Sequence, residues 1–266
     1  MESKIVLLKD LGPNLPVGFG GTENEIIERP WTMKQERELG GIRDSERNQN
    51  VASFVSVVLS HLCSRIGPYD FEAMKEPERR VIVSKTLMPD VYYVYIWLRI
   101  QAIGNMLEMD LVCPQCNHSF IFTGDLLSTE VRVPEEGAER TWEYQLVKPF
   151  EIRGTKVESL ILGPAYWSAI EPVSAGEFNT GEAKAALIRG SIREIPALDG
   201  PIALTLDELD DMVKIDIESI SSGLEENRLG PDMSIEGKCP KCKREFKTAM
   251  DWGYDSFFSV SSRLNR

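Results

Sequence analysis

The sequence lacks a long apolar segment. Its longest uninterrupted apolar run, Val91–Leu98, has eight residues, whereas a membrane-spanning helix needs about 20. The first ten residues, MESKIVLLKD, contain an apolar run of four residues before the next lysine, which is too short for a signal peptide. We therefore expect a protein of a reducing cytoplasm without membrane contact. In that compartment, paired cysteines bind metal or exchange electrons rather than form structural disulfides.

The sequence also lacks the signatures of common enzyme classes. It contains no GxSxG, HExxH, phosphate-binding loop or dinucleotide fingerprint, and its two histidines leave few candidates for general acid–base catalysis. The glycine-rich stretch 18–21 is not directly followed by Lys-Ser or Lys-Thr, as a phosphate-binding loop would be, and therefore predicts a turn. The acidic cluster Asp207, Glu208, Asp210 and Asp211 lies in the first turn of a predicted helix, where it favours the helix dipole. We expect no catalytic residue and no small-molecule substrate.

An excess of positive charge is absent as well. The formal net charge is -12, with 42% hydrophobic and 27% charged residues. This composition is typical of a globular protein, and the negative field disfavours a phosphate backbone. We therefore expect no nucleic-acid partner.

Periodic apolar residues predict helices in the N-terminal half. Residues 50–63 carry an apolar stripe with the spacing of one helix face, and Thr32 and Gln35 form a capping box for a helix to about Leu39. At the end of the stripe, His61 is interpreted as a surface or core residue and Cys63 as a small buried hydrophobe. Ile26–Arg29 is expected to be a short strand.

Residues 89–104, PDVYYVYIWLRIQAIG, are ambiguous. Their β-branched and aromatic content favours a strand, whereas the Pro-Asp start and the closing Gly104 favour a capped helix. We predict a buried helix. Its tyrosines and Trp97 are interpreted as core residues rather than as a stacking platform for bases.

Further along, strands are predicted on either side of a turn at Arg153–Thr155. Two helices are predicted over residues 182–193 and 206–222. The second would begin at a capping box of Thr205 and Glu208 and end at Gly223.

The strongest motif is present twice. CPQCNHSF spans Cys113–Phe120 and CPKCKREF spans Cys239–Phe246. Each copy is flanked by residues typical of strands, so each is expected to be the tip of a hairpin. Two facing CxxC turns offer four thiolates in a tetrahedron, the geometry that Zn²⁺ prefers in structural sites. The pattern predicts a zinc-ribbon-like clasp with a structural zinc bound by Cys113, Cys116, Cys239 and Cys242.

Alternatives remain at this site. One pair could be a redox dithiol, although no βαβ context accompanies it. Both pairs could bind nothing, and His118 could replace one ligand. With four protein ligands the metal has no open position, so the site predicts stability rather than catalysis.

The long separation of the two pairs is physically acceptable. Closing a loop of about 120 residues instead of about 17 costs an extra ~1.7 kcal/mol, whereas a structural zinc contributes roughly 10–16 kcal/mol. We therefore expect an α+β protein in which an inserted module hangs from the clasp. The expected layout is an extended arm (1–24), a mainly helical N-terminal domain (25–108), the clasp (109–124 and 237–250), an inserted α/β module (125–236) and a C-terminal tail (251–266).

The second cysteine turn is locally basic. Five basic residues surround it: Lys238, Lys241, Lys243, Arg244 and Lys247. They favour a second hypothesis, a zinc-ribbon adaptor associated with nucleic acid or the transcription machinery. Against that reading, the first turn has no lysine or arginine, and basic residues near zinc also offset thiolate charge.

The order of these features resembles the baseplate protein family of T-even-like phages and related contractile tails. The resemblance is carried by ERPWTMKQEREL, by LMPDVYYVYIWLRIQAIGNMLEMDLVCPQCNHSFIF and by DLLSTEVRV. It covers about residues 14–135, with the second CPxC motif at 239–242 as a further match, and does not extend to residues 136–236.

This resemblance implies that the four cysteines are metal ligands and that Arg99 is structural. It further implies a non-enzymatic component or assembly factor of the tail baseplate or hub. Such a protein would contact other tail proteins in the cytoplasm of an infected bacterium, with the virion tail as a further location.

Overall fold

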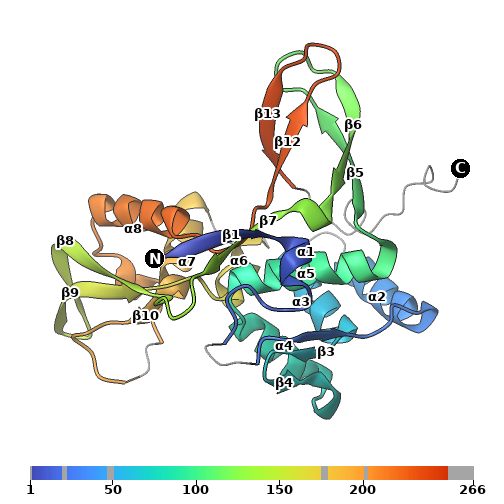
Figure 1. The fold of residues 1–266 in the computed structure, drawn as a ribbon. Coiled ribbons are helices and arrows are strands. Elements are labelled where there is room, and N and C mark those ends of the chain that lie inside the picture. Colours follow the sequence, from blue (N-terminus) through green and yellow to red (C-terminus); the bar gives the residue numbers. More distant parts are fainter. Residues whose placement is uncertain (1, 20–22, 47–50, 175–178, 201–202, 251–266) are drawn as a thin grey trace, which may run out of the picture.

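The structure is a computed structural model that describes residues 2–19, 23–46, 51–174, 179–200 and 203–250. It mixes helices with antiparallel strand pairs, in agreement with the predicted α+β class. Three parts can be followed in Figure 1: a helical body, a lobe beside it, and a narrow tower of two hairpins that rises from the body.

The body contains most of the N-terminal half. Its helices are α1 (Leu8–Leu11), α2 (Met33–Glu46), α3 (Val51–Leu62), α4 (Glu76–Lys85), α5 (Met88–Ile103) and α6 (Glu171–Ser174), with short 3-10 turns η1 (Phe71–Ala73), η2 (Leu126–Ser128) and η3 (Trp167–Ala169). Two small sheets complete it, in the strand orders β1-β7-β11 and β2-β3-β4. Their strands are β1 (Ser3–Leu7), β2 (Ile26–Glu28), β3 (Cys63–Ile66), β4 (Tyr69–Asp70), β7 (Glu130–Pro134) and β11 (Gly230–Pro231).

Helix α5 lies in the core of the body, as its sequence predicts. Val91, Val94 and Ile96 are completely buried, and so are two of its tyrosines. Pro89 occupies the first turn, where its missing N–H costs nothing, and Gly104 ends the helix with a φ of 94°. The helix is apolar on every side because it is surrounded by other parts of the body. The same even distribution of apolar residues is why the sequence alone also allows a strand.

The first residues of the chain differ from the predicted extended arm. Ser3–Leu7 pairs antiparallel with Glu130–Pro134, and Leu8, Leu15 and Val17 are buried. The Gly/Pro-rich composition indicates irregular backbone, but the apolar side chains between the glycines and prolines are long enough to reach the core. This segment is therefore part of the body.

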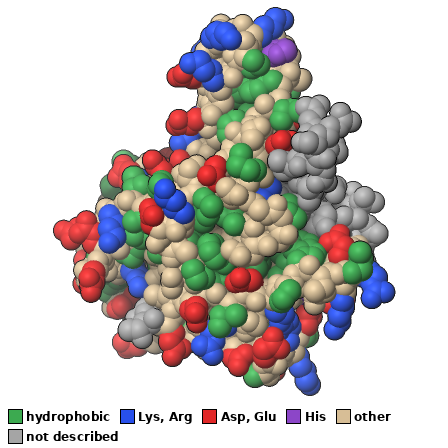
Figure 2. Space-filling model, turned by 45° about the vertical axis from the view of Figure 1, so that its right-hand side comes forward, with side chains coloured by type: hydrophobic (Ala, Val, Ile, Leu, Met, Phe, Trp, Pro, Cys, Tyr) green, Lys and Arg blue, Asp and Glu red, His purple; other side chains and the backbone are tan. Residues whose placement is uncertain are grey.

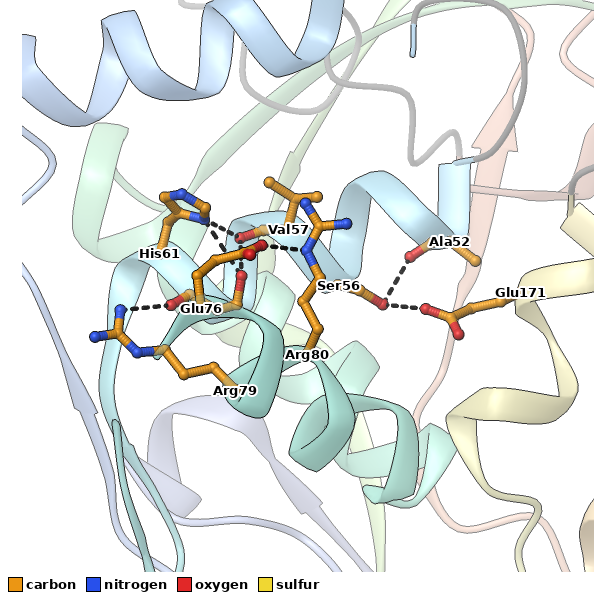
Figure 3. A network of polar contacts seen from close by, with 9 residues as sticks. Ala52, Ser56, Val57, His61, Glu76, Arg79, Arg80 and Glu171 are labelled. Carbon is orange, nitrogen blue, oxygen red and sulfur yellow. Dashed lines mark hydrogen bonds and ion pairs between the residues drawn. The ribbon is translucent and has the colours of Figure 1, made fainter. Parts of the chain in front are cut away.

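A polar network attaches neighbouring elements to α3 (Figure 3). The Ser56 hydroxyl donates to the Glu171 carboxylate of α6 over 2.5 Å, and Arg79 of α4 donates to the Ser60 carbonyl oxygen. His61 turns back along its own helix, with Nδ1 3.0 Å from the Val57 carbonyl oxygen. The expectation of a structural His61 is consistent with this position.

The lobe has a separate hydrophobic core. It consists of strands β8 (Trp142–Ile152), β9 (Thr155–Leu162) and β10 (Ile192–Glu194), helices α7 (Thr180–Ser191) and α8 (Lys214–Glu226), and the 3-10 turn η4 (Asp207–Leu209). The turn between β8 and β9 lies at Arg153 and Gly154, both with positive φ, as predicted. In contrast, the strands at 130–134 and 230–231, inside the predicted 125–236 module, belong to the sheet of the body.

The helix predicted over residues 206–222 was wrong at both ends. Glu208 accepts the Thr205 N–H, but its carboxylate also pairs with Arg153 across the lobe, and only the short turn η4 forms there. The α-helix begins at Lys214 and continues through Gly223 to Glu226. Leu209 and Met212 are buried in the lobe core, so tertiary packing breaks the helix that the local pattern predicts.

Two further points concern the whole chain. The predicted C-terminal tail, residues 251–266, lies outside the described residues. Within the described part of the chain, no helix combines the length and the apolar character that crossing a bilayer requires.

Candidate metal centre

The tower consists of two antiparallel hairpins, residues 106–125 and 234–249. Strand β5 (Met106–Val112) pairs with β6 (Ser119–Asp125), and β12 (Ser234–Lys238) pairs with β13 (Glu245–Ala249). Alternate residues of β5 are buried, which is the period-2 pattern of a strand with one covered face. Figure 1 shows the two hairpins side by side, although more than 100 residues of chain separate them.

Aromatic residues join the two hairpins. The rings of Phe120 and Phe246 meet edge to face with 6.2 Å between their centroids. Gly237 lies so close to Phe246 and Leu111 that a Cβ atom there would be 3.0 Å from the Phe246 ring and 3.3 Å from a Leu111 methyl. The tower therefore has a small apolar interior, but its width leaves room for few such contacts.

The two cysteine turns have matching backbone conformations. In the first, Cys113 N–H donates to the His118 carbonyl and Asn117 N–H donates to the Cys113 carbonyl, over 3.0 and 2.9 Å. In the second, Cys239 and Lys243 donate to Arg244 and Cys239, both over 2.9 Å. The residue after each second cysteine has a positive φ, 52° at Asn117 and 63° at Lys243. Each CPxC sequence thus forms the same tight loop with both thiols on one side.

All four sulfur atoms converge at the tip of the tower. They lie within 4.8 Å of one another, with 3.6 Å between Cys113 and Cys242 and 3.7 Å between Cys116 and Cys239. Four sulfurs around a tetrahedral zinc, each at about 2.3 Å, would be about 3.8 Å apart. The four cysteines are therefore close enough to bind one metal ion. Across the described residues, this is the set of possible ligands that the structure brings together, and His118 is not part of it.

Local hydrogen bonds favour the thiolate at two of these positions. Burial alone would raise the pKa of Cys113, but N–H groups of Cys116 and Gln115 point at its sulfur and lower the pKa to about 6. Burial likewise opposes ionisation of Cys239, and N–H groups of Cys242 and Lys241 outweigh it, so that its pKa is lowered.

The pKa of Cys116 shifts in the opposite direction, which indicates that the cluster requires a positive charge. The His118 N–H lowers its pKa, but burial and the three neighbouring sulfurs raise it to about 12. Four thiolates cannot stay this close without a positive charge among them. A bound cation would supply that charge and allow all four cysteines to ionise together.

The surroundings of the tip are exposed and basic. Cys113 and Cys239 are fully buried and Cys242 is exposed, whereas Lys241, Lys243 and Arg244 are all exposed. Figure 2 shows Lys and Arg side chains at the free end of the tower. Arg244 donates to the Gln115 side chain over 2.8 Å and so connects the two cysteine turns.

Arg99 connects the tower to the body. Its side chain is buried and donates to the carbonyl oxygens of Gly104 and Met106, the latter over 2.6 Å. These contacts hold the start of β5 against the end of α5, which agrees with the structural role that the resemblance implies. The acidic cluster is elsewhere, around η4, where Glu208 is neutralised by Arg153.

Comparison with known families places the chain. The sequence model of a family described as "T4 bacteriophage base plate protein" matches residues 20–259. Because the match covers most of the chain, the protein belongs to this family of phage baseplate proteins. The family match includes residues 136–236, to which the sequence resemblance did not extend. No curated protein and no solved structure matches the chain significantly.

Proposed function

We propose that this protein is a non-enzymatic structural or assembly protein of a contractile-tail baseplate or hub, and that it acts through contacts with other tail proteins. The family match over residues 20–259 is the observation that carries the proposal. Baseplates are built from many proteins in contact, so a family member is expected to present surfaces to neighbours. The infected host cytoplasm, where tails assemble, is the proposed place of action.

A structural zinc ion is part of the proposal. Cys113, Cys116, Cys239 and Cys242 would hold it, and four thiolates leave no position for water or substrate. The ion would join hairpins that are distant in the sequence, and so fix the tower on a body that is otherwise connected to it through β5, β7 and β11. Its chemistry would be confined to neutralising and binding the four thiolates.

A second candidate is a zinc-ribbon adaptor that binds nucleic acid. The exposed Lys241, Lys243 and Arg244 at the tower tip favour it, because cations on a protruding element can reach a phosphate backbone. The net charge of -12 opposes it, and Lys238 and Lys247 are already paired with Glu245 and Asp232.

Purification from infected cells distinguishes the two candidates. The tagged full chain is captured before and after nuclease treatment and across a range of salt concentrations. The baseplate role predicts that tail proteins co-purify after nuclease treatment, with no bound nucleic acid. Retention of DNA or RNA that falls steeply with salt, together with loss of the tail proteins after nuclease, would instead establish the adaptor.

A further inference from the structure

A cationic groove lies between the body and the lobe, away from the cysteine cluster. It encloses about 530 Å³ and is lined by residues from segments that are distant in the sequence. Lys85 is the last residue of α4, Arg140 precedes β8 and Arg193 lies in β10. No aspartate or glutamate is among the described residues that line it. The protein has a net charge of -12, so a groove lined by three cations and by no described acidic side chain stands out from the rest of its surface.

The two arginines of the groove are held in place by groups that carry no net charge. Arg193 stacks on the Tyr166 ring, with its guanidinium carbon 4.1 Å from the ring centroid, and donates to the carbonyl oxygens of Gly190 and Pro164. Arg140 donates to the Gly18 carbonyl oxygen over 3.1 Å. Backbone carbonyls satisfy N–H groups but carry no net charge, so these contacts do not balance the positive charge of the two arginines.

The buried carboxylate near the groove, that of Asp90, already accepts hydrogen bonds from the backbone. Asp90 is buried and accepts hydrogen bonds from the N–H groups of Val17 and Gly18, over 2.8 and 3.0 Å. It holds the loop that forms one wall and does not line the groove. The charge of Arg140 lowers the pKa of Asp90, but the Asp90 carboxylate is turned to the backbone N–H groups of the loop and the groove surface stays cationic.

The walls of the groove are partly apolar and are joined by ring contacts and backbone hydrogen bonds. Phe19 meets Tyr69 edge to face with 5.1 Å between ring centroids. Where the body meets the lobe, Met88 N–H donates to the Ala165 carbonyl and Trp167 N–H to the Thr86 carbonyl, over 2.8 and 2.9 Å. A ligand for such a groove combines negative charge with apolar or aromatic surface. A nucleic-acid duplex presents its phosphates without apolar surface beside them, whereas an acidic protein segment with an aromatic residue has both properties.

We propose that this groove docks an acidic, aromatic-containing segment of a partner protein, with carboxylates bound by Lys85, Arg140 and Arg193 and the apolar side chains lying against Phe19, Tyr69 and Tyr166. This inference rests on the proposed function in one respect, namely that the ligand of the groove is another protein. It requires neither the metal nor the tower tip, so an experiment can disprove the docking groove without disproving the metal centre, and the reverse.

Charge reversal at the groove tests the proposal in the full chain. Lys85 is exposed and has no hydrogen-bond partner among the described contacts, so Lys85→Glu should fold normally. Lys9→Glu, at an exposed lysine on α1 outside the groove, makes the same charge change. The probe is a fluorescent peptide of alternating glutamate and tyrosine, and its glutamine counterpart is the uncharged reference. Fluorescence anisotropy measures binding at low and moderate salt.

The acidic peptide is expected to bind the native chain and the Lys9→Glu variant equally, and the Lys85→Glu variant at least tenfold more weakly. Arg140→Gln, which keeps a donor for the Gly18 carbonyl, should weaken binding as well. Equal binding to native and Lys85→Glu chains, equal binding of the glutamine peptide, or no binding at all would overturn the proposal. Tighter binding of a single-stranded oligonucleotide at the groove, or a dimer abolished by Lys85→Glu, would also overturn it, in favour of nucleic acid or a second copy.

Discussion

The five cysteines of this chain have two different environments. Four lie at the tower tip, where hydrogen bonds favour the thiolates of Cys113 and Cys239. Cys63 begins β3 in the core, and burial raises its pKa far above the usual value. Thiolates react with alkylating agents and thiols do not, so the two groups should differ sharply in reactivity.

Alkylation of the native chain tests this difference. A metal bound by four thiolates protects them, so we expect little modification before a chelator is added. After chelation, four cysteines should react, and Cys63 should react only when the chain is unfolded in denaturant. Mass spectrometry of the peptides identifies the modified sites. Rapid labelling of Cys63 in the native chain would contradict the core position, and rapid labelling of the other four would contradict a bound metal.

Asp90 makes stability depend on pH. Burial is the largest effect and raises its pKa to about 7, although hydrogen bonds from Val17 and Gly18 and the charge of Arg140 oppose the rise. Between its unfolded pKa near 4 and about 7, the folded chain therefore binds more protons at this group than the unfolded chain does. The contribution of Asp90 is fully present below about pH 4 and is lost as pH rises to about 7, at most about 1.4 kcal/mol per pH unit.

The Asp90→Asn variant replaces this titratable carboxyl group with an amide that does not titrate. The free energy of unfolding of the native chain minus that of the variant is expected to fall as pH rises between about 5.5 and 7.5. Denaturant unfolding of both proteins in the same zinc-containing buffers measures the difference and cancels effects of pH on the cysteine cluster. A difference that stays constant, or grows with pH, would show that Asp90 is ionised throughout.

At the scale of single elements, two helical glycines have different surroundings. Gly190 in α7 packs against Ala169 of η3, and a Cβ atom there would overlap the Ala169 Cβ. Gly223 lies inside α8, where a Cβ atom would be in ordinary contact with Trp142, 3.7 Å from its ring nitrogen. The same substitution therefore has opposite consequences at the two positions.

The pair Gly190→Ala and Gly223→Ala measures this contrast. Gly223→Ala should stabilise the chain by about 0.5–1 kcal/mol, because alanine favours helix interiors. Gly190→Ala should destabilise it by about 1–3 kcal/mol through overpacking. Thermal and denaturant unfolding supply both values. Destabilisation by Gly223→Ala would support a helix end at that residue, as the sequence alone suggests.

That glycine also shows how far local sequence determines an element. Helix α5 could be predicted because its caps and its apolar residues all agree. The start of the helix after Thr205 could not be predicted. Glu208 pairs with Arg153, which lies more than 50 positions away in the sequence, and Leu209 and Met212 are buried in the lobe core. Local patterns succeed where they agree with packing, and tertiary contacts decide the rest.

At the scale of the whole molecule, the sequence indicated which cysteines meet but not how the parts are arranged. Two turns with the same CPxC pattern predict a shared ion whatever lies between them. The pairing of β1 with β7 and the cationic groove could not be predicted, because each depends on segments brought together only by the fold. Lys85, Arg140 and Arg193 share no motif and no spacing.

Removing the metal should affect the tower more than the body. The tower has few apolar contacts of its own, whereas α3 and α5 lie in a large core. After chelation, hydrogen exchange is expected to accelerate strongly in residues 106–125 and 234–249 and to change little in α3 and α5. Readdition of zinc should restore protection. Equal loss of protection throughout would mean that the ion holds the whole chain together, and no change would mean that the hairpins need no ion.

The proposed architecture depends on one ion that joins the two hairpins through four cysteines. Elemental analysis of the purified full chain counts this ion, with Cys113→Ser as the ligand variant and Cys63→Ala as the control outside the cluster. We expect about one zinc per chain in the native protein and the control, and a large loss in Cys113→Ser. A native chain purified without any bound metal, or equal zinc in native and Cys113→Ser chains, would contradict it.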